Sequence, residues 1–159
     1  MGQVPEPAAT YQVFINYGGP DTECTLATLI YRTLKSHGLR VFLGKEELQE
    51  GEMIVPAISG AISSASVHIA LFSERYAESS YSLDELCWIL RSSHERTIIP
   101  VYWNVEPVNL RYLEKGCYAE ALERHQQRGR VTQVDRWKAA LREASEISGF
   151  ILKTDQFER

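Results

Sequence analysis

The sequence contains no apolar run long enough to span a bilayer and no low-complexity tract. It also has little cysteine: Cys24, Cys87 and Cys117 are odd in number and widely spaced, which predicts neither a disulfide framework nor a zinc site. We therefore expect buried thiols in a reducing compartment. The net charge of −4 gives no electrostatic reason to expect nucleic acid or an anionic membrane as the main partner.

The N-terminal segment shows no targeting signal. Residues 1–10, MGQVPEPAAT, have neither the basic start nor the apolar centre of a signal peptide. The 159 residues are enough for one domain with a substantial core. We expect a flexible tail over residues 1–10, one domain over 11–152, a second tail over 153–159 and a cytoplasmic location.

Histidine is scarce as well, and the histidines present are scattered: His37, His68, His94 and His125. Their spacing does not suit metal ligands, and none has a Ser or Cys partner in a recognisable nucleophile setting. The acidic loop GKEELQEGE, residues 44–52, is predicted to be solvated surface, since a metal site there would need ligands from elsewhere. We expect no metal, no cofactor and no catalytic triad.

What the sequence does contain is a regular alternation of strands and helices. Short β-branched and aromatic runs predict strands over 11–16, 39–43, 67–73 and 97–103. Apolar residues at helical spacing predict helices over about 21–37, 53–64, 81–90, 118–127 and 134–147. This alternation predicts a five-stranded, doubly wound, flavodoxin-like α/β fold with a parallel sheet of order 2-1-3-4-5. The fifth strand is expected from this architecture without a location in the sequence, and Pro100 indicates an edge or irregular position in the fourth.

In an open parallel sheet, ligands bind beyond the carboxyl ends of the strands, where the strand order reverses. That crevice lies between the first and third strands and brings together the loops 17–22 and 73–82, with the loop 44–52 alongside as a possible lid. The run Gly18-Gly19-Pro20 is typical of a tight turn. Two glycines beside a helix N-terminus would also suit a phosphate, although GGPDT matches neither a P-loop nor GxGxxG. Both interpretations stay open.

The stretch YSLDELCWIL, residues 81–90, brings adjacent carboxylates to this crevice. Ser82 and Glu85 have the spacing of a capping box, in which Ser82 caps the helix and Glu85 reaches back to its backbone N–H. The predicted core stripe of this helix is Leu83, Leu86, Cys87 and Leu90. Glu85 points away from that stripe, flanked by Tyr81, Trp88 and Ile89. The pattern alone favours the cap, but a carboxylate beside aromatic rings in a crevice is also a candidate for chemistry.

A family resemblance is carried by five blocks in specific order and spacing: YQVFINYGGPDT, LRVFLGKEELQEGE, AISSASVHIALFSERYAESSYSLDEL, TIIPVYWNVEP and VDRWKAALREASEISGF. From about Tyr11 to Phe150 the chain resembles the plant-type Toll/interleukin-1 receptor (TIR) domain, and it looks most like the small plant proteins of the TIR-only class. The resemblance implies the flavodoxin-like fold already predicted. It also implies cleavage of NAD+ at the nicotinamide–ribose bond, giving nicotinamide with ADP-ribose or a cyclic isomer, in plant immune and cell-death signalling.

The resemblance further implies which residues act. The family's catalytic glutamate falls on Glu85. The substrate-binding residues would be Tyr17, Gly18, Gly19, Asp21, Thr22, Gly51, Ser79 and Tyr81. A lid completing the site of a neighbouring copy would include Lys45, Glu46, Glu47, Leu48 and Ile54. NAD+ would be a substrate rather than a cofactor, and the expected protein partners are further copies of the chain and other TIR proteins.

The chain departs from the family pattern at four places. The family usually has Arg where this chain has Gly18, and Trp-Cys where it has Tyr81–Ser82. It usually has an acidic lid residue where this chain has Gly44, and a self-association Ser-His pair where it has Thr28–Leu29. The loss of a basic side chain at Gly18 and the altered pair Thr28–Leu29 favour an alternative function, a catalytically weak module for TIR–TIR interaction. A third possibility on the same fold is a receiver-like phosphoacceptor. It lacks the acidic cluster it would need, because Asn16, Tyr17 and Gly18 occupy the end of the first strand.

Overall fold

The computed structural model of the chain describes residues 10–19, 26–43, 54–92 and 97–153. The tails predicted over 1–10 and 153–159 therefore lie outside the described residues, apart from Thr10 and Lys153. None of the described helices is long and apolar enough to cross a membrane.

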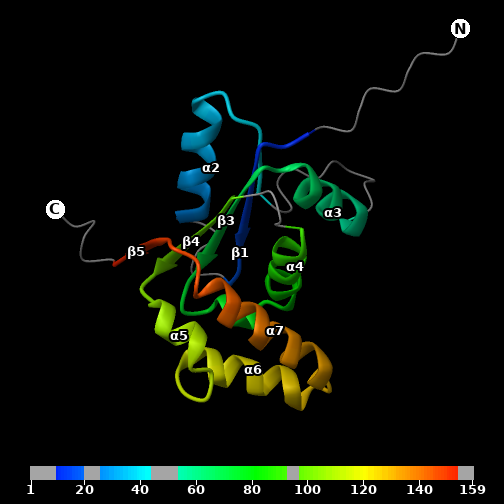
Figure 1. Cartoon of the computed structure of the whole chain (residues 1–159), viewed down its shortest axis with the longest axis vertical. Coiled ribbons are helices and arrows are strands. Elements are labelled where there is room, and N and C mark those ends of the chain that lie inside the picture. The colour runs from blue at the N-terminus through cyan, green and yellow to red at the C-terminus, as the bar shows by residue number, and fades with distance from the viewer. Residues whose placement is uncertain (1–9, 20–25, 44–53, 93–96, 154–159) are drawn as a thin grey trace, which may run out of the picture.

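Short strands form one five-stranded parallel sheet (Figure 1). They are β1 (Val13–Tyr17), β2 (Val41–Phe42), β3 (Val67–Phe72), β4 (Thr97–Trp103) and β5 (Phe150–Leu152). Their order is β2-β1-β3-β4-β5, which confirms the predicted doubly wound fold. Because β1 has β2 on one side and β3 on the other, the switch in strand order lies between β1 and β3, as predicted.

Helices connect these strands, and all except η2 and α5 overlap the segments in which apolar spacing predicted them. They are α2 (Leu26–Ser36), α3 (Ile54–Ser64), the short 3₁₀ helix η2 (Tyr76–Glu78), α4 (Ser80–Arg91), α5 (Pro107–Arg111), α6 (Cys117–Gln127) and α7 (Val131–Ala144). Figure 1 shows α2 on one side of the sheet and α3 and α4 on the other.

The side chains of β1 point alternately to the two faces of the sheet, and each face is covered by helices. Val13 and Ile15 are buried in one cluster with Ala27 of α2. Phe14, between them in sequence, is buried in another cluster with Ile89 of α4. Successive side chains of a strand point to opposite faces, so a continuous apolar run is what a strand covered on both faces requires.

The region that leads into α4 is held by aromatic rings in edge-to-face and stacked contacts. The ring of Tyr76 in η2 is fully buried, 4.8 Å from that of Phe72 at the end of β3. Phe72 in turn lies 5.5 Å from Tyr102 of β4, and Tyr76 lies 6.4 Å from Tyr118 of α6. These contacts fix η2, and with it the start of α4, against the sheet.

The fifth strand, which the sequence did not locate, follows α7. Among the described residues, β5 pairs with β4 only from Val101 onward, so Pro100 has a strand neighbour on one side, Ala70 of β3. Pro100 therefore occupies a locally edge-like position within an internal strand, where proline is tolerated. The chain passes close to it just before β5: a Cβ on Gly149 would lie 2.1 Å from the carbonyl oxygen of Pro100.

Candidate active site

The loop after β1 lies directly against the first turn of α4. Ser82 Oγ donates a hydrogen bond to the carbonyl oxygen of Tyr17 at 2.5 Å. Gly18 is buried against the same turn, and a Cβ there would lie 2.7 Å from Ser82 Oγ and 2.9 Å from the carbonyl oxygen of Tyr76. The strand order thus places Gly18 beside the helix that carries Glu85, as the switch-point argument predicted.

The predicted capping box is wrong. Helix α4 begins at Ser80, and its cap is Ser79, whose side chain accepts a hydrogen bond from the backbone N–H of Ser82 at 3.2 Å. Ser82 lies inside the helix, and its hydroxyl is bonded to the loop after β1 rather than to Glu85. Glu85 is therefore beyond the first turn, and its carboxylate is not needed to cap the helix.

Glu85 is instead a partly buried carboxylate with one hydrogen-bond partner among the described residues. Its Oε1 accepts a hydrogen bond from Asn16 Nδ2, at the end of β1, at 3.0 Å. The pKa of Glu85 is raised from its ordinary value of 4.5 to about 7, mainly because the carboxyl is buried. The hydrogen bond from Asn16 lowers this pKa, and the neighbouring charge of Asp84 raises it further. A carboxyl group whose pKa lies near neutral pH is typical of a functional residue.

The adjacent carboxylate has a different, structural contact. Asp84 Oδ1 accepts a hydrogen bond from the indole Nε1 of Trp137 in α7 at 2.9 Å. Trp137 is buried in the same cluster as Leu83 and Leu86, the two fully buried members of the predicted core stripe. Asp84 thus holds α4 against α7, while Glu85 faces β1. Ile89, predicted to flank Glu85, is instead fully buried, because it fills the cluster between α4 and the sheet.

Two buried polar residues of the site were missed by the sequence analysis. Asn16 and Tyr76 are fully buried, and the Tyr76 hydroxyl donates to Asn16 Oδ1 at 2.5 Å. Asn16 had a signal: it is the polar residue of an apolar strand, at the carboxyl end beside the switch point. Tyr76 had none, because its role depends on η2 reaching back to β1.

The structure describes only some of the other predicted site residues. Gly19 has a positive φ of 80°, which suits the tight-turn interpretation of this loop. Tyr81 is 67% exposed at the start of α4. Outside the described residues lie Asp21, Thr22, Lys45, Glu46, Glu47, Leu48 and Gly51; Ile54 begins α3. The assigned roles in substrate binding stay predictions.

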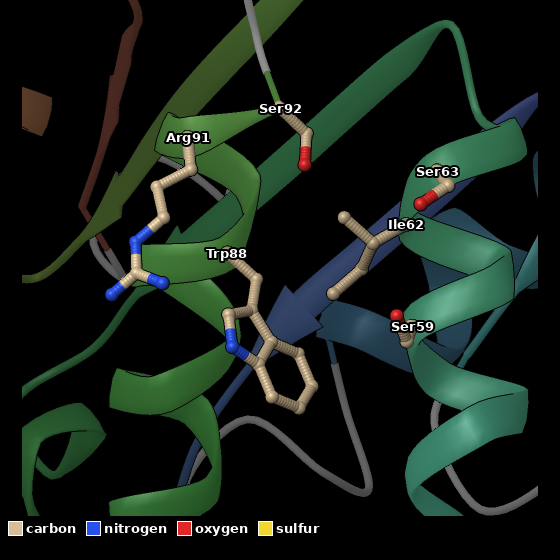
Figure 2. A pocket seen from close by; sticks show the side chains of 6 residues that line it. All are labelled: Ser59, Ile62, Ser63, Trp88, Arg91 and Ser92. Carbon is tan, nitrogen blue, oxygen red and sulfur yellow. The ribbon is translucent and has the colours of Figure 1, made fainter.

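A pocket of about 150 Å³ lies between α3 and α4 (Figure 2). Its described lining residues are Ser59, Ile62, Ser63, Trp88, Arg91 and Ser92. Figure 2 shows the indole of Trp88 lying on the α3 side of α4. Trp88 is three residues beyond Glu85 and so on the same side of the helix, which means that the pocket continues the face on which Glu85 lies.

The described residues contain no group of three or more His, Cys, Asp or Glu side chains that could hold a metal ion. Two histidines are structural: His125 Nε2 lies 2.9 Å from the carbonyl oxygen of Ala77, and His68 Nε2 lies 3.0 Å from that of Ile62. Cys87 is a partly buried free thiol, whereas Cys117 is exposed, so the expectation of buried thiols is wrong for Cys117. Cys117 is the first residue of α6, where the helix turns it toward solvent.

Gly18 yields a prediction, because the structure leaves little room for a Cβ at this position. Gly18→Ala is expected to lower the free energy of unfolding by about 1–3 kcal/mol, since the new Cβ meets Ser82 Oγ and a backbone oxygen inside 3.0 Å. Urea unfolding measures the change. Gly60→Ala is the matched control: it is in a helix with nothing within 4 Å of the new Cβ, and should be neutral or stabilising. Equal stability of Gly18→Ala and the wild type would contradict the packing described.

Comparison with known proteins agrees with the fold. The family model described as the TIR domain matches residues 10–158. The "Probable 2' cyclic ADP-D-ribose synthase BdTIR" of Brachypodium distachyon is 35% identical over 140 residues, which cover 87% of this chain and 58% of that protein. "Disease resistance protein RPV1" of Vitis rotundifolia is 32% identical over 151 residues, which cover 94% of this chain and 11% of that protein.

A solved structure gives the same result in three dimensions. The TIR domains of the activated Roq1 resistosome directly recognising the pathogen effector XopQ match with a TM-score of 0.81 and 30% identity, over 90% of this chain and 88% of that chain. The chain spans only 11% of the length of RPV1 and 58% of that of BdTIR. The resemblance read from the sequence is confirmed: this chain belongs to the TIR domain family.

Proposed function

We propose that the chain is an NAD+ nucleosidase that cleaves the nicotinamide–ribose bond and releases nicotinamide with ADP-ribose or a cyclic ADP-ribose-type signal. The observation that carries the proposal is Glu85: a partly buried carboxylate at the switch-point crevice, bonded to Asn16, with its pKa raised to about 7. The similarity to a relative named as a probable 2' cyclic ADP-D-ribose synthase supports the same chemistry. Similarity to plant disease resistance proteins supports a role in immune and cell-death signalling.

One carboxylate is sufficient for this reaction. The leaving group of NAD+ is a pyridinium cation, so when the bond from C1′ to nitrogen breaks, the electron pair stays on nitrogen and neutral nicotinamide departs. An ordinary glycoside would need a second carboxyl group to protonate the leaving oxygen. The positive charge moves to an oxocarbenium-like ribosyl group, which the Glu85 carboxylate stabilises. Water then adds at C1′ and loses a proton to give ADP-ribose, or a hydroxyl group of the same molecule adds to give a cyclic product.

Self-association belongs to the same proposal. The Roq1 match is to TIR domains within a resistosome assembly. On this chain Leu29, which aligns with the family's self-association pair, is 60% exposed on α2. The lid predicted from Lys45 to Ile54 would act in a neighbouring copy, so activity is expected to rise with protein concentration.

The alternative is a TIR–TIR interaction module with little catalytic activity. It is favoured by the absence of a basic side chain at Gly18 and by Tyr81 in place of Trp, where the smaller ring offers less area for stacking on a base. Incubation of concentrated protein with NAD+, followed by chromatography of free nicotinamide, separates the two. The enzyme releases nicotinamide and Glu85→Gln does not; a wild type that self-associates without releasing nicotinamide is the interaction module.

The pH dependence of the reaction follows from the environment of Glu85. Nicotinamide release should rise with pH and level off above about 7, because the carboxylate stabilises the transition state and burial raises its pKa to about 7. Below that pH the rate should fall roughly tenfold per unit. Initial rates between about pH 5 and about pH 8.5, corrected for the protein-free reaction, measure this. A rate independent of pH would rule out Glu85 as the titrating group.

A further inference from the structure

The side chain amide of Asn16 is held in one orientation by three hydrogen bonds. Its Nδ2 donates to Glu85 Oε1 at 3.0 Å and to the carbonyl oxygen of Ser82 at 3.1 Å. Its Oδ1 accepts from the Tyr76 hydroxyl at 2.5 Å. With Glu85 ionised, a flipped amide would place oxygen against a carboxylate and a carbonyl, both of which are acceptors only. The three partners come from α4 and η2, while Asn16 is the penultimate residue of β1, so the amide joins three separate elements.

We propose that Asn16 is the positioning residue of the site: locked by Tyr76 and the Ser82 carbonyl, its amide holds Oε1 of Glu85 and favours the ionised carboxylate. This rests on the proposed function of Glu85. Tyr76 is suited to donate a hydrogen bond to Asn16. Burial raises the pKa of its phenol well above the ordinary value, and the charge of Glu85 raises it further. The phenol therefore keeps its proton and acts as the donor to Oδ1, which leaves only the amide N–H groups to face Glu85.

Because Asn16 binds Oε1 of Glu85, the other carboxylate oxygen, Oε2, is the one that would contact the substrate. Within the described residues, Oε2 of Glu85 has no hydrogen-bond partner, whereas Oε1 is occupied by Asn16. A carboxylate held at one oxygen by a residue of a rigid strand can present the other in a constant position, which is the condition for electrostatic stabilisation without reorganisation. Asn16 would thus set the direction in which Glu85 meets the ribose.

Among the residues that the structure describes, few charged groups act on Glu85 alongside the amide of Asn16. Its own helix carries the titratable groups Tyr81, Asp84, Cys87 and Arg91. Of these, Asp84 acts on Glu85 and raises its pKa, although Asp84 is itself bonded to Trp137 of α7. From η2 comes the neutral phenol of Tyr76, and from β1 the phenol of Tyr17. Helix α3, residues 54–64, has no titratable side chain. Within the described part of the chain, the amide of Asn16 is then the main group that favours the charged form.

The test measures the pKa of Glu85 directly, by ¹³C NMR titration of its side-chain carboxyl, assigned by its loss in Glu85→Gln. Asn16→Leu keeps the volume and removes the amide, while Tyr76 retains the Ser82 carbonyl, 3.1 Å away, as an acceptor. The pKa of Glu85 should rise by about 1 unit, the size expected for loss of one hydrogen bond to a charged group. At pH 7 nicotinamide release should fall about fivefold, and it should recover above about pH 9.

A matched pair of conservative variants covers the case in which Asn16→Leu does not fold. Tyr76→Phe removes the hydroxyl that orients Asn16, and should raise the pKa of Glu85 by a smaller amount. Tyr118→Phe removes an equally buried hydroxyl, which donates to the Ser73 carbonyl at 2.6 Å, and keeps the ring that lies beside Tyr76; it should leave that pKa unchanged. Equal pKa values of Glu85 in the wild type, Asn16→Leu and Tyr76→Phe would overturn the inference.

This design separates failure of the inference from failure of the proposed function. If the wild type releases no nicotinamide but the carboxyl titration responds to Asn16→Leu, the NAD+ chemistry is wrong and the role of Asn16 stands. If the wild type releases nicotinamide and neither the titration nor the pH profile responds, Glu85 acts without Asn16 and the inference is wrong.

Discussion

Glu85→Gln is expected to lower nicotinamide release at least about 100-fold, the loss typical of removing one group that stabilises charge in a transition state. Glutamine has the same shape and can still accept the hydrogen bond from Asn16 Nδ2, so the geometry around Oε1 is preserved. What it lacks is the negative charge that the oxocarbenium-like ribosyl group requires. Initial rates at pH 8, where the wild-type carboxyl is ionised because its pKa is about 7, give the full difference.

Stability provides the control for this substitution, since Glu85 is not part of a helix cap. The pKa of the carboxyl is about 7 in the folded chain against an ordinary value of 4.5, so the folded state binds more protons between those values. The wild type therefore loses stability as pH rises from about 4.5 through about 7, whereas Glu85→Gln lacks this dependence. The variant should be at least as stable as the wild type at pH 8. Lower stability there would mean that the loss of activity reflects unfolding rather than chemistry.

Gly149→Ala is expected to have the largest effect on stability, about 3 kcal/mol or more. The new Cβ would lie 2.1 Å from the carbonyl oxygen of Pro100, and a backbone oxygen in a paired strand cannot rotate away as a side chain can. For a domain of this size, that loss corresponds to a fall in Tm of about 6–12 °C. Thermal unfolding followed by circular dichroism measures it.

The control for Gly149 is again Gly60→Ala, which meets nothing within 4 Å and should not lower Tm. If β5 instead detaches to relieve the contact, the amides of Phe150–Leu152 should exchange with solvent hydrogen faster than in the wild type, while the rest of the sheet is unchanged. An alanine variant with both the wild-type Tm and wild-type exchange at β5 would contradict the close approach of Gly149 to Pro100.

The fold was largely predictable because its strongest strands are buried on both faces. Continuous apolar runs such as 67–73 and 97–103 stand out in the sequence, and their alternation with helices leaves few topologies. The fifth strand is different: it has three residues, of which Phe150 is 63% and Ile151 46% exposed. A strand this short and exposed has no recognisable alternation of apolar and polar residues. Its place is set by the tertiary approach of Gly149 to Pro100.

The site was predictable in position but not in its contacts. Strand order alone brought Gly18 to the helix of Glu85, whereas the capping pattern of Ser82 and Glu85 was misleading. The spacing Ser-x-x-Glu is local, but the Ser82 hydroxyl is bonded to the Tyr17 carbonyl, a contact between residues 65 positions apart. Propensities over a few residues carry no information on such a contact. The same is true of the hydrogen bonds that hold the Asn16 side chain, which join residues far apart in the sequence.

The central claim is that Glu85, as a carboxylate, cleaves NAD+ at this crevice. The most direct test is free nicotinamide released from NAD+ by concentrated wild-type protein and by Glu85→Gln, side by side, across the pH range on either side of 7. We predict a wild-type rate that rises with pH and levels off above about 7, and a rate for Glu85→Gln that stays at the protein-free background at every pH. Equal release by the two proteins, or no release by the wild type at any pH, would contradict it.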